Sequence, residues 1–263
     1  MRAAFQKDDA LVADIACARA EGRTRLWWLG QSGFLVSSTQ GTILFDPYLS
    51  DSLTRKYAAT DKPHTRLTER VIAPERLTGI NVITSSHNHT DHLDADTLGP
   101  LFAANPSAKL VIPRANRALV LDRLGEVAGR LVEVDAGESL IVSGMEIHGI
   151  PAAHNTVERD AQGCCRFLGF VVRVAGKTIA TGGGELSRSG DVILFDVATG
   201  KATQTWKERH GDTVLCLDFS PDGKRIASGG ADKIARVTDI ATGKQVNLFE
   251  GHTHHVMGIA FRA

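Results

Sequence analysis

The chain has 263 residues, of which 43% are hydrophobic and 23% charged, and this is the composition of an ordinary globular protein with one large domain or two small ones. Thirty basic side chains balance thirty acidic ones, so the formal net charge is zero and bulk electrostatics favour neither nucleic acid nor an anionic membrane as a partner. No apolar run approaches the roughly 20 residues that a membrane-spanning helix needs.

The start of the chain and the cysteines indicate the compartment. Residues 1–9 lack the apolar core of a signal peptide. The four cysteines form no C-x-x-C pair, and Cys164 and Cys165 are adjacent, so neither a disulfide framework nor a thiolate zinc site is indicated. We therefore expect a cytoplasmic protein in a reducing environment.

The first elements in chain order are a helix and two strands. Apolar residues at helical spacing predict a helix over residues 9–20. Strand-like runs follow at residues 26–36 and 42–45, joined by a turn-rich segment. Residues 51–74 are polar and predict a long loop, which we interpret as a wall of a substrate pocket because long loops in compact domains are usually functional or mobile.

A dense group of ligand-type side chains comes next, at His87-Asn88-His89-Thr90-Asp91-His92. Three imidazoles and a carboxylate at this spacing suit a borderline divalent metal. A short buried strand is predicted before them at 81–84 and a helix after them at 94–104, kinked or split at Gly99-Pro100. The ligands are thus placed on a strand-to-helix loop; a polar loop with chance histidines is the weaker interpretation.

The following segment alternates between strand and helix. We predict a strand over 109–113, a helix over 115–127 and a strand over 131–134, then β structure over 139–150 that ends shortly before His154. Such alternation is typical of a sheet with helices packed against it. The predicted class is therefore α/β.

The H-x-H-x-D-H pattern resembles the metallo-β-lactamase superfamily of binuclear metal hydrolases. Residues 27–34 and 43–50 look like the first strands of that fold, most of all in its branch containing the ascorbate-6-phosphate lactonases. The N-acyl-phosphatidylethanolamine phospholipase D group is a more distant relative with a similar Ser-His-Asn-His-x-Asp-His-Leu-Asp run. The resemblance covers roughly residues 7–179 and implies the N-terminal part of an αββα sandwich.

The resemblance also implies a ligand set for one or two divalent ions, zinc or manganese. His87, His89 and His154 would hold the first ion, and Asp91 and His92 the second. Asp91 would also orient the attacking water and take its proton, and Asp46 would brace the metal loop from behind the ligands, although Asp before Pro is also simply good turn chemistry.

The resemblance ends near residue 179. The family would next supply a Gly-Asp pair whose Asp bridges two metals, then further βα units and a last metal-binding His. Gly184 stands where the bridging Asp is expected. We therefore expect residues 1–179 to form a hydrolase domain without its C-terminal half.

An internal repeat follows, because residues 196–201 recur as 239–244, a shift of 43 residues. Short β runs, glycine turns and residues 219–230 resemble the WD-repeat family of β-propellers. We expect residues 180–263 to hold one full blade with parts of two others, which is too little for a closed ring.

Three residues of the WD-repeat part match the structural hydrogen-bonding set of that family. They are His210, Ser228 and Asp232. The signature Trp is replaced by Phe195 in one copy and by Thr238 in the other. We expect these residues to be structural and not catalytic.

Two functions from different classes are open. The first is a metal-dependent hydrolase that acts on an ester, lactone or phosphodiester bond of a small-molecule substrate, with activity impaired by the lost bridging Asp and last His. The second is a WD-repeat scaffold that binds a protein partner without catalysis. Each part would expose an apolar face, so self-association is also expected.

Overall fold

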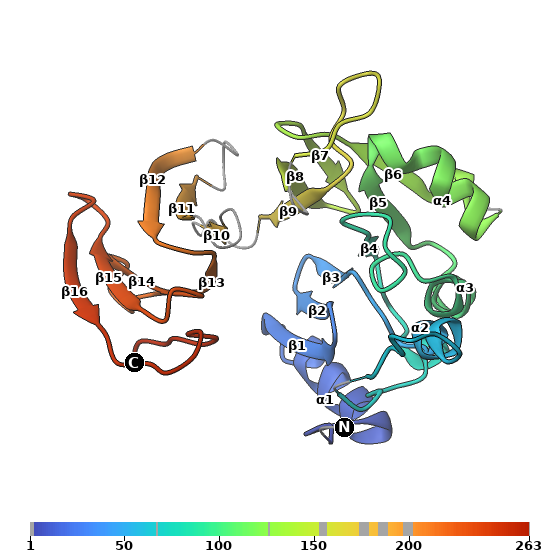
Figure 1. Cartoon of the computed structure of the whole chain (residues 1–263). Coiled ribbons are helices and arrows are strands. Elements are labelled where there is room, and N and C mark those ends of the chain that lie inside the picture. Colours follow the sequence, from blue (N-terminus) through green and yellow to red (C-terminus); the bar gives the residue numbers. More distant parts are fainter. Residues whose placement is uncertain are drawn as a thin grey trace. The chain divides into compact units, whose positions relative to one another are not determined.

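The computed structural model describes residues 3–66, 68–125, 127–152, 157–173, 179–183, 189–196 and 202–262, without side chains for 179–183 and 195. The chain forms two compact units, Met1–Val174 and Ala175–Ala263, which are described separately (Figure 1). Among the described residues, no helix combines the length and the apolar character needed to cross a membrane. The predicted boundary at residue 179 and the missing half-domain remain predictions.

A six-stranded sheet organises the first unit. Its strands lie side by side in chain order: β1 (Arg25–Gly30), β2 (Gly33–Ser38), β3 (Gly41–Phe45), β4 (Val82–Thr84), β5 (Lys109–Pro113) and β6 (Leu131–Val134). The pairs β1–β2 and β2–β3 are antiparallel and joined by short turns, whereas β3 to β6 run parallel. Parallel neighbours need long crossover connections, and the segments between β3, β4, β5 and β6 supply them.

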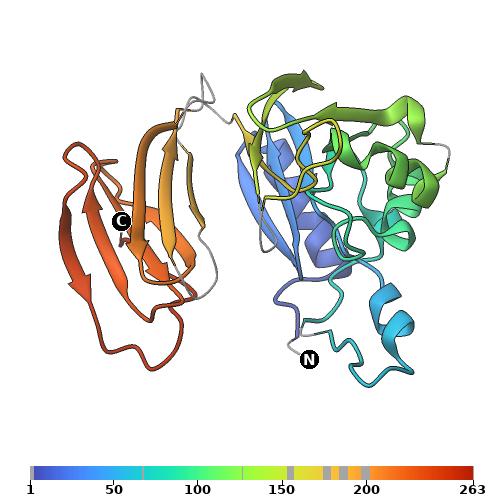
Figure 2. The same cartoon turned by 45° about the horizontal axis from the view of Figure 1, so that its top comes forward.

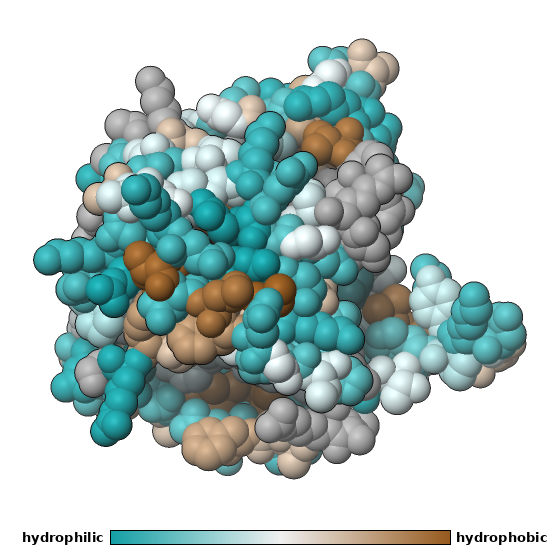
Figure 3. All heavy atoms as spheres, turned by 60° about the vertical axis from the view of Figure 1, so that its left-hand side comes forward, coloured by the Kyte–Doolittle hydropathy of each residue, from teal (hydrophilic) through white to brown (hydrophobic). Residues whose placement is uncertain are grey.

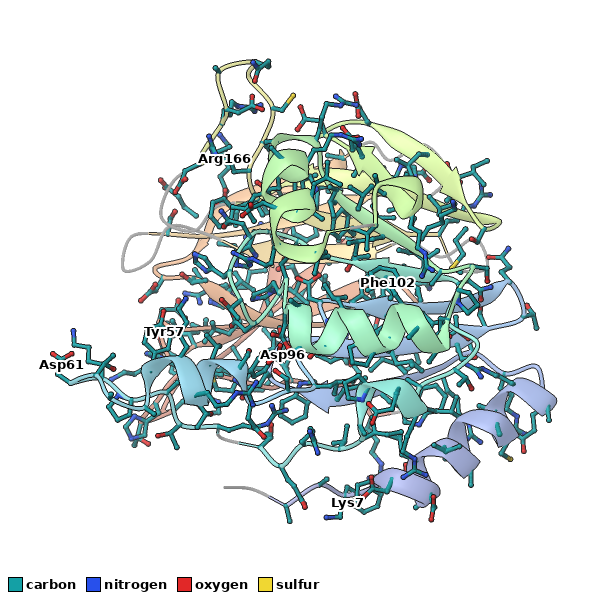
Figure 4. The ribbon with its side chains drawn as sticks, turned by 90° about the vertical axis from the view of Figure 1, so that its right-hand side faces the viewer. Lys7, Tyr57, Asp61, Asp96, Phe102 and Arg166 are labelled. Carbon is teal, nitrogen blue, oxygen red and sulfur yellow. The ribbon has the colours of Figure 1, made fainter. Side chains whose placement is uncertain are left out.

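Helices cover one face of this sheet and a second sheet covers the other (Figures 1 and 2). The helices are α1 (Asp8–Ala20), α3 (Ala95–Ala104) and α4 (Arg117–Leu124), and the second sheet consists of β7 (Ser139–Val142), β8 (Met145–Pro151) and β9 (Leu168–Val172). Figure 4 looks onto the helical side, where Asp96 and Phe102 mark the two ends of α3.

Successive side chains along the strands of the six-stranded sheet enter two different cores, one under the helices and one between the two sheets. Ile83 of β4 packs into the core under the helices, while its neighbour Val82 packs into the core between the sheets. Leu110 and Val111 of β5 divide in the same way. Successive side chains of a strand point to opposite faces, so continuous apolar runs are required where both faces are covered.

Several predicted elements differ from the structure. The helix predicted over 115–127 is the shorter α4, which ends before Gly125 with its left-handed φ of 65°. Residues 26–36 form a hairpin of β1 and β2 and not one strand, because the chain turns at Gln31, whose φ is 51°. The polar stretch 51–74 contains a short helix, α2 (Ser52–Tyr57). Helix α3 continues through Pro100, since its apolar side chains are anchored in the core on both sides of the proline.

The second unit is built from antiparallel strands. A three-stranded sheet holds β10 (Ile179–Gly183), β11 (Gly190–Phe195) and β12 (Ala202–His210). A four-stranded meander holds β13 (Val214–Phe219), β14 (Arg225–Gly230), β15 (Ala235–Asp239) and β16 (Gln245–Phe249). The meander has the four strands of one propeller blade.

Strand β16 predicts self-association. It is an edge strand, and its Val246, Leu248 and Phe249 are exposed. Hydrophobic clusters also interrupt the hydrophilic surface in Figure 3. We expect light scattering to show concentration-dependent association that Leu248→Lys reduces, because a lysine on an edge strand opposes pairing. Gln40→Lys adds the same charge in an exposed turn between β2 and β3, away from this edge strand, and is the matched control. A monomer at every concentration would contradict the prediction.

Candidate metal centre

The centre is built where two neighbouring strands end. β3 and β4 are parallel and pair Phe45 with Thr84, so their carboxyl ends meet at one edge of the sheet. Asp46 follows β3 directly, and its backbone N–H donates to the carbonyl oxygen of Thr84 at 3.2 Å. Ligands bind at the carboxyl ends of parallel strands in open α/β sheets. The strand ends therefore bring Asp46 to the loop that carries the histidines.

Asp46 is the hydrogen-bonding hub of this edge. Its Oδ1 accepts from the Thr84 hydroxyl at 2.8 Å and from the Ser86 N–H at 3.0 Å. Its Oδ2 accepts from the Ser86 hydroxyl and from Nδ1 of His92, the latter at 2.7 Å. Asp46 is only 7% exposed and has a left-handed φ of 40°. A buried carboxylate is tolerated only when its oxygens are satisfied, and these four donors satisfy them.

The hub fixes the tautomers of two imidazoles. Nδ1 of His92 carries the proton that it donates to Asp46. The Ser86 hydroxyl gives its own proton to Asp46, so it accepts from Nδ1 of His87 at 2.9 Å. These assignments follow from the hydrogen-bond network. In the neutral form of each ring, Nε2 is then the unprotonated nitrogen, and this is the form that binds a metal.

The histidine rings lie together against one aromatic side chain. The centroids of His87 and His89 are 4.7 Å apart, those of His87 and His92 are 4.0 Å apart, and Phe167 lies 5.0 Å from His87. Burial, with His92 and His89 close by, lowers the pKa of His87 to about 4. His87 is therefore neutral at physiological pH, as a metal ligand must be.

Donors from several elements hold the loop backbone. The Leu168 N–H at the start of β9 donates to the Ser86 carbonyl oxygen at 3.0 Å. The Ser32 hydroxyl, from the turn after β1, donates to the Asp91 carbonyl oxygen at 2.7 Å. The loop is thus tied to the scaffold through its carbonyl groups, which leaves its side chains to bind a ligand.

The structure brings most of the predicted site residues together. His87, His89 and His92 cluster as rings, and the Asp91 carboxylate lies 3.7 Å from Nε2 of His92. His154 and Gly184 lie outside the described residues, so their predicted places stay predictions. The residues that sequence reasoning missed are Ser86, Ser32 and Phe167. Of these three, only Ser86 could have been predicted from the sequence, because it directly precedes the histidine motif.

Among the described residues, the ligand-type atoms that converge belong to a different trio from the predicted one. Asp46, His87 and His92 each place one ligand-type atom within 4.8 Å of the others. Both Asp46 oxygens are already occupied by hydrogen bonds, so direct coordination would require it to give up at least one of them. A supporting position requires no such loss. The donor set of imidazole nitrogens and the Asp91 carboxylate suits a divalent ion.

The three residues of the predicted WD-repeat set, His210, Ser228 and Asp232, lie within hydrogen-bonding distance in the second unit. Nε2 of His210 lies 2.8 Å from the Ser228 hydroxyl, and its Nδ1 lies 3.0 Å from Asp232. Arg236 donates to Asp232 at 2.9 Å. Thr238, which replaces the signature Trp, is only 1% exposed. This arrangement holds β12, β14 and the turn before β15 together, as a structural set would.

Asp232 predicts acid sensitivity of this unit. Burial raises the pKa of its carboxyl, but hydrogen bonds from His210 and backbone N–H groups outweigh burial and lower it. A lowered folded pKa gives stability that is present above the unfolded value of about 3.9 and is lost as pH falls. We expect Asp232→Asn to reduce the free energy of unfolding by ~1–3 kcal/mol at pH 7 and to weaken this acid dependence, measured by urea unfolding. Equal stability at pH 7 would contradict the prediction. Asp61→Asn, at an exposed position of the first unit, is the control.

Comparisons with known proteins agree with these features. A family model described as a beta-lactamase superfamily domain matches residues 41–201, and a WD domain, G-beta repeat, matches residues 200–239. A metal-dependent hydrolase of Aeropyrum pernix is 25% identical over 179 residues, covering 64% of this chain and 61% of the relative. One of Ruegeria sp. is 26% identical over 163 residues, covering 60% and 62%.

One further relative and one solved structure are also similar to this chain. Transcription initiation factor TFIID subunit 5 of Caenorhabditis elegans is 26% identical over 178 residues, covering 68% of this chain and 22% of the relative. Among solved structures, CmlA, a diiron beta-hydroxylase from Streptomyces venezuelae, is 22% identical with a TM-score of 0.41, covering 66% of this chain and 29% of that one.

The share of this chain and of each relative that is aligned decides which conclusions the comparisons support. The chain spans about three fifths of the length of the two hydrolases. The beta-lactamase superfamily match covers more than half of this chain and includes Asp46 and the whole histidine loop. The predicted α/β fold with a following WD repeat is confirmed. This chain belongs to the beta-lactamase superfamily and carries a WD repeat after its superfamily domain.

Proposed function

We propose that the chain is a metal-dependent hydrolase that acts on an ester, lactone or phosphodiester bond of a small molecule. The observation that carries the proposal is the Asp46 hub, which holds His87 and His92 with Nε2 available to a metal. The two metal-dependent hydrolases among the relatives support it. Zinc or manganese is the proposed metal, since both accept imidazole and carboxylate ligands.

The proposed roles follow from the positions of the side chains. His87 and His89, with His154, would hold the first ion, and Asp91 and His92 would contribute to a second. When bound, a divalent ion polarises the bond to be broken and provides a nucleophile near neutral pH. Asp91, whose side chain is 37% exposed, would orient the attacking water and accept its proton.

Hydrolysis assays test the function directly. We expect the chain loaded with zinc or manganese to hydrolyse an aryl ester, an aryl lactone or bis-aryl phosphodiester, and Asp91→Asn to lower the rate by at least ~100-fold, as expected for a general base. Asp122→Asn, at an exposed position of α4, is the matched control for an Asp→Asn change away from the centre. Wild-type protein that takes up metal but hydrolyses none of the three substrates would contradict the proposal.

The expected stoichiometry is about one tightly bound ion per chain. The first site keeps a three-histidine set, whereas Asp91 and His92 alone leave a second ion largely to water. Elemental analysis after gel filtration measures the ratio. Two tightly held ions would contradict this expected stoichiometry.

A second candidate is a protein-binding scaffold. The WD-repeat match and the hydrogen bonds among His210, Ser228 and Asp232 favour it, because a blade with its structural set retained can present a stable surface. Metal-free, inert protein that binds a defined partner, with binding lost in His210→Ala, would support the scaffold over the hydrolase.

A further inference from the structure

Arg123 lies in the last turn of α4, distant in sequence from the histidine loop, and its guanidinium reaches the loop backbone. Nη1 donates to the carbonyl oxygen of Asn88 at 2.8 Å and to that of Leu93 at 3.0 Å. These two carbonyls stand immediately before and after residues 89–92, the segment that carries His89, Asp91 and His92. One side chain thus holds both ends of the ligand-bearing turn.

The turn needs such a support. Within it, the N–H groups of His92 and Leu93 both donate to the His89 carbonyl oxygen, at 3.0 and 2.8 Å. This closes the turn locally but does not fix where the turn lies relative to His87. Hydrogen bonds from a charged donor are roughly twice as strong as neutral ones, and a guanidinium can hold two acceptors in a fixed geometry. Arg123 therefore sets the distance between the two ends of the turn and joins them to α4.

We infer that Arg123 is a positioning residue for the metal centre: through Asn88 and Leu93 it places the ligands of residues 89–92 against His87. The inference rests on the proposed metal site. Both hydrogen bonds of its Nη1 go to backbone carbonyls of the loop, so its effect on metal affinity is expected through the positions of the ligands. Groups that support metal ligands from outside typically change affinity 10–100-fold when lost.

A second arginine in the same groove separates positioning from general packing. Arg123 and Arg130 both line a cavity of about 290 Å³ between α3 and α4, together with Gly99 and Phe102. Nη1 of Arg130 also donates to two carbonyl oxygens, those of Phe102 and Asn105, at 3.0 and 3.5 Å. Those carbonyls belong to the end of α3, whose Phe102 is labelled in Figure 4, and not to the histidine loop. Arg130→Met therefore removes the same kind of contact without touching the ligands.

The experiment compares metal affinity of the full chain with Arg123→Met, Arg123→Lys and Arg130→Met, using Co²⁺ and Zn²⁺ in competition with a chromophoric chelator. We expect Arg123→Met to bind ~10–100-fold more weakly and to change the Co²⁺ absorption spectrum. Arg123→Lys is expected to lie between it and wild type, because its ammonium has enough donors for both carbonyls but sits on a shorter and more flexible stem than the planar guanidinium. Arg130→Met is expected to bind as wild type does, even if it melts at a lower temperature.

The outcomes separate this inference from the proposed function. If wild type binds metal and Arg123→Met binds equally well, the positioning role is wrong while the metal site stands. An equal loss of affinity in Arg130→Met would also overturn it, since packing alone would then explain the effect. If Arg123→Met does not fold, Arg123→Lys decides, and wild-type affinity with an unchanged spectrum would overturn the role. Absence of metal uptake by wild type would overturn the proposed function itself and this inference with it.

Discussion

Replacing His87 and His89 together with alanine is expected to abolish tight metal uptake. Their rings are 4.7 Å apart, and both belong to the proposed first site. Removing two of three imidazole ligands leaves an ion mostly to water. Because a ligand that binds only the folded state stabilises it, wild type at a zinc concentration 100 times its dissociation constant should gain about 2.7 kcal/mol, and the variant should gain none.

Thermal melting with and without zinc measures this difference, and elemental analysis gives the metal content. The double variant His252→Ala with His254→Ala is the matched control, because both histidines are exposed and lie in the second unit. It should retain the full zinc-dependent rise in melting temperature. An equal rise in the His87/His89 variant and in wild type would show that the loop does not bind the metal.

Local patterns in the sequence predicted the elements well where burial decides the structure. Residues 109–113 and 131–134 became β5 and β6 with the predicted bounds, since continuous apolar runs between helices have few other places to go. The division of residues 26–36 into a hairpin was missed because apolar content runs through both strands, although Gly30 and the Ser32-Gly33 dipeptide around the turn could have revealed it.

The site was predictable in part for a similar reason. The proposed ligands His87, His89, Asp91 and His92 are close in sequence, so their spacing alone predicted them as a set. Their supports come from elsewhere in the chain: Asp46 from the end of β3, Ser32 from the β1–β2 turn and Arg123 from α4. Contacts of this kind depend on strand order and register, which a single sequence does not specify. Asp46 was found only through the family resemblance.

Asp46→Asn tests whether the hub orients the ligands, and it is expected to keep the fold while weakening metal binding by ~10–100-fold. The amide has the same shape as the carboxylate, but its NH₂ group is a donor. If the amide nitrogen faces Nδ1 of His92, the ring proton moves to Nε2 and blocks that nitrogen from the metal. If the amide oxygen faces Nδ1 instead, the NH₂ group meets the Thr84 hydroxyl and the Ser86 N–H, and the Ser86 N–H loses its acceptor. The first result removes the tautomer that coordination needs, and the second loosens the loop that carries the histidines.

Nitrogen NMR of the imidazoles reports the tautomer, and chelator competition reports the affinity. Asp94→Asn is the matched control, because Asp94 is equally buried but accepts hydrogen bonds from Ser50 and Thr97 and from neither histidine. Asp94→Asn should lower stability with the His92 tautomer unchanged. If Asp46→Asn binds zinc as tightly as wild type and His92 keeps its proton on Nδ1, Asp46 does not orient the ligands, and the proposed division between ligands and supports at this centre is wrong.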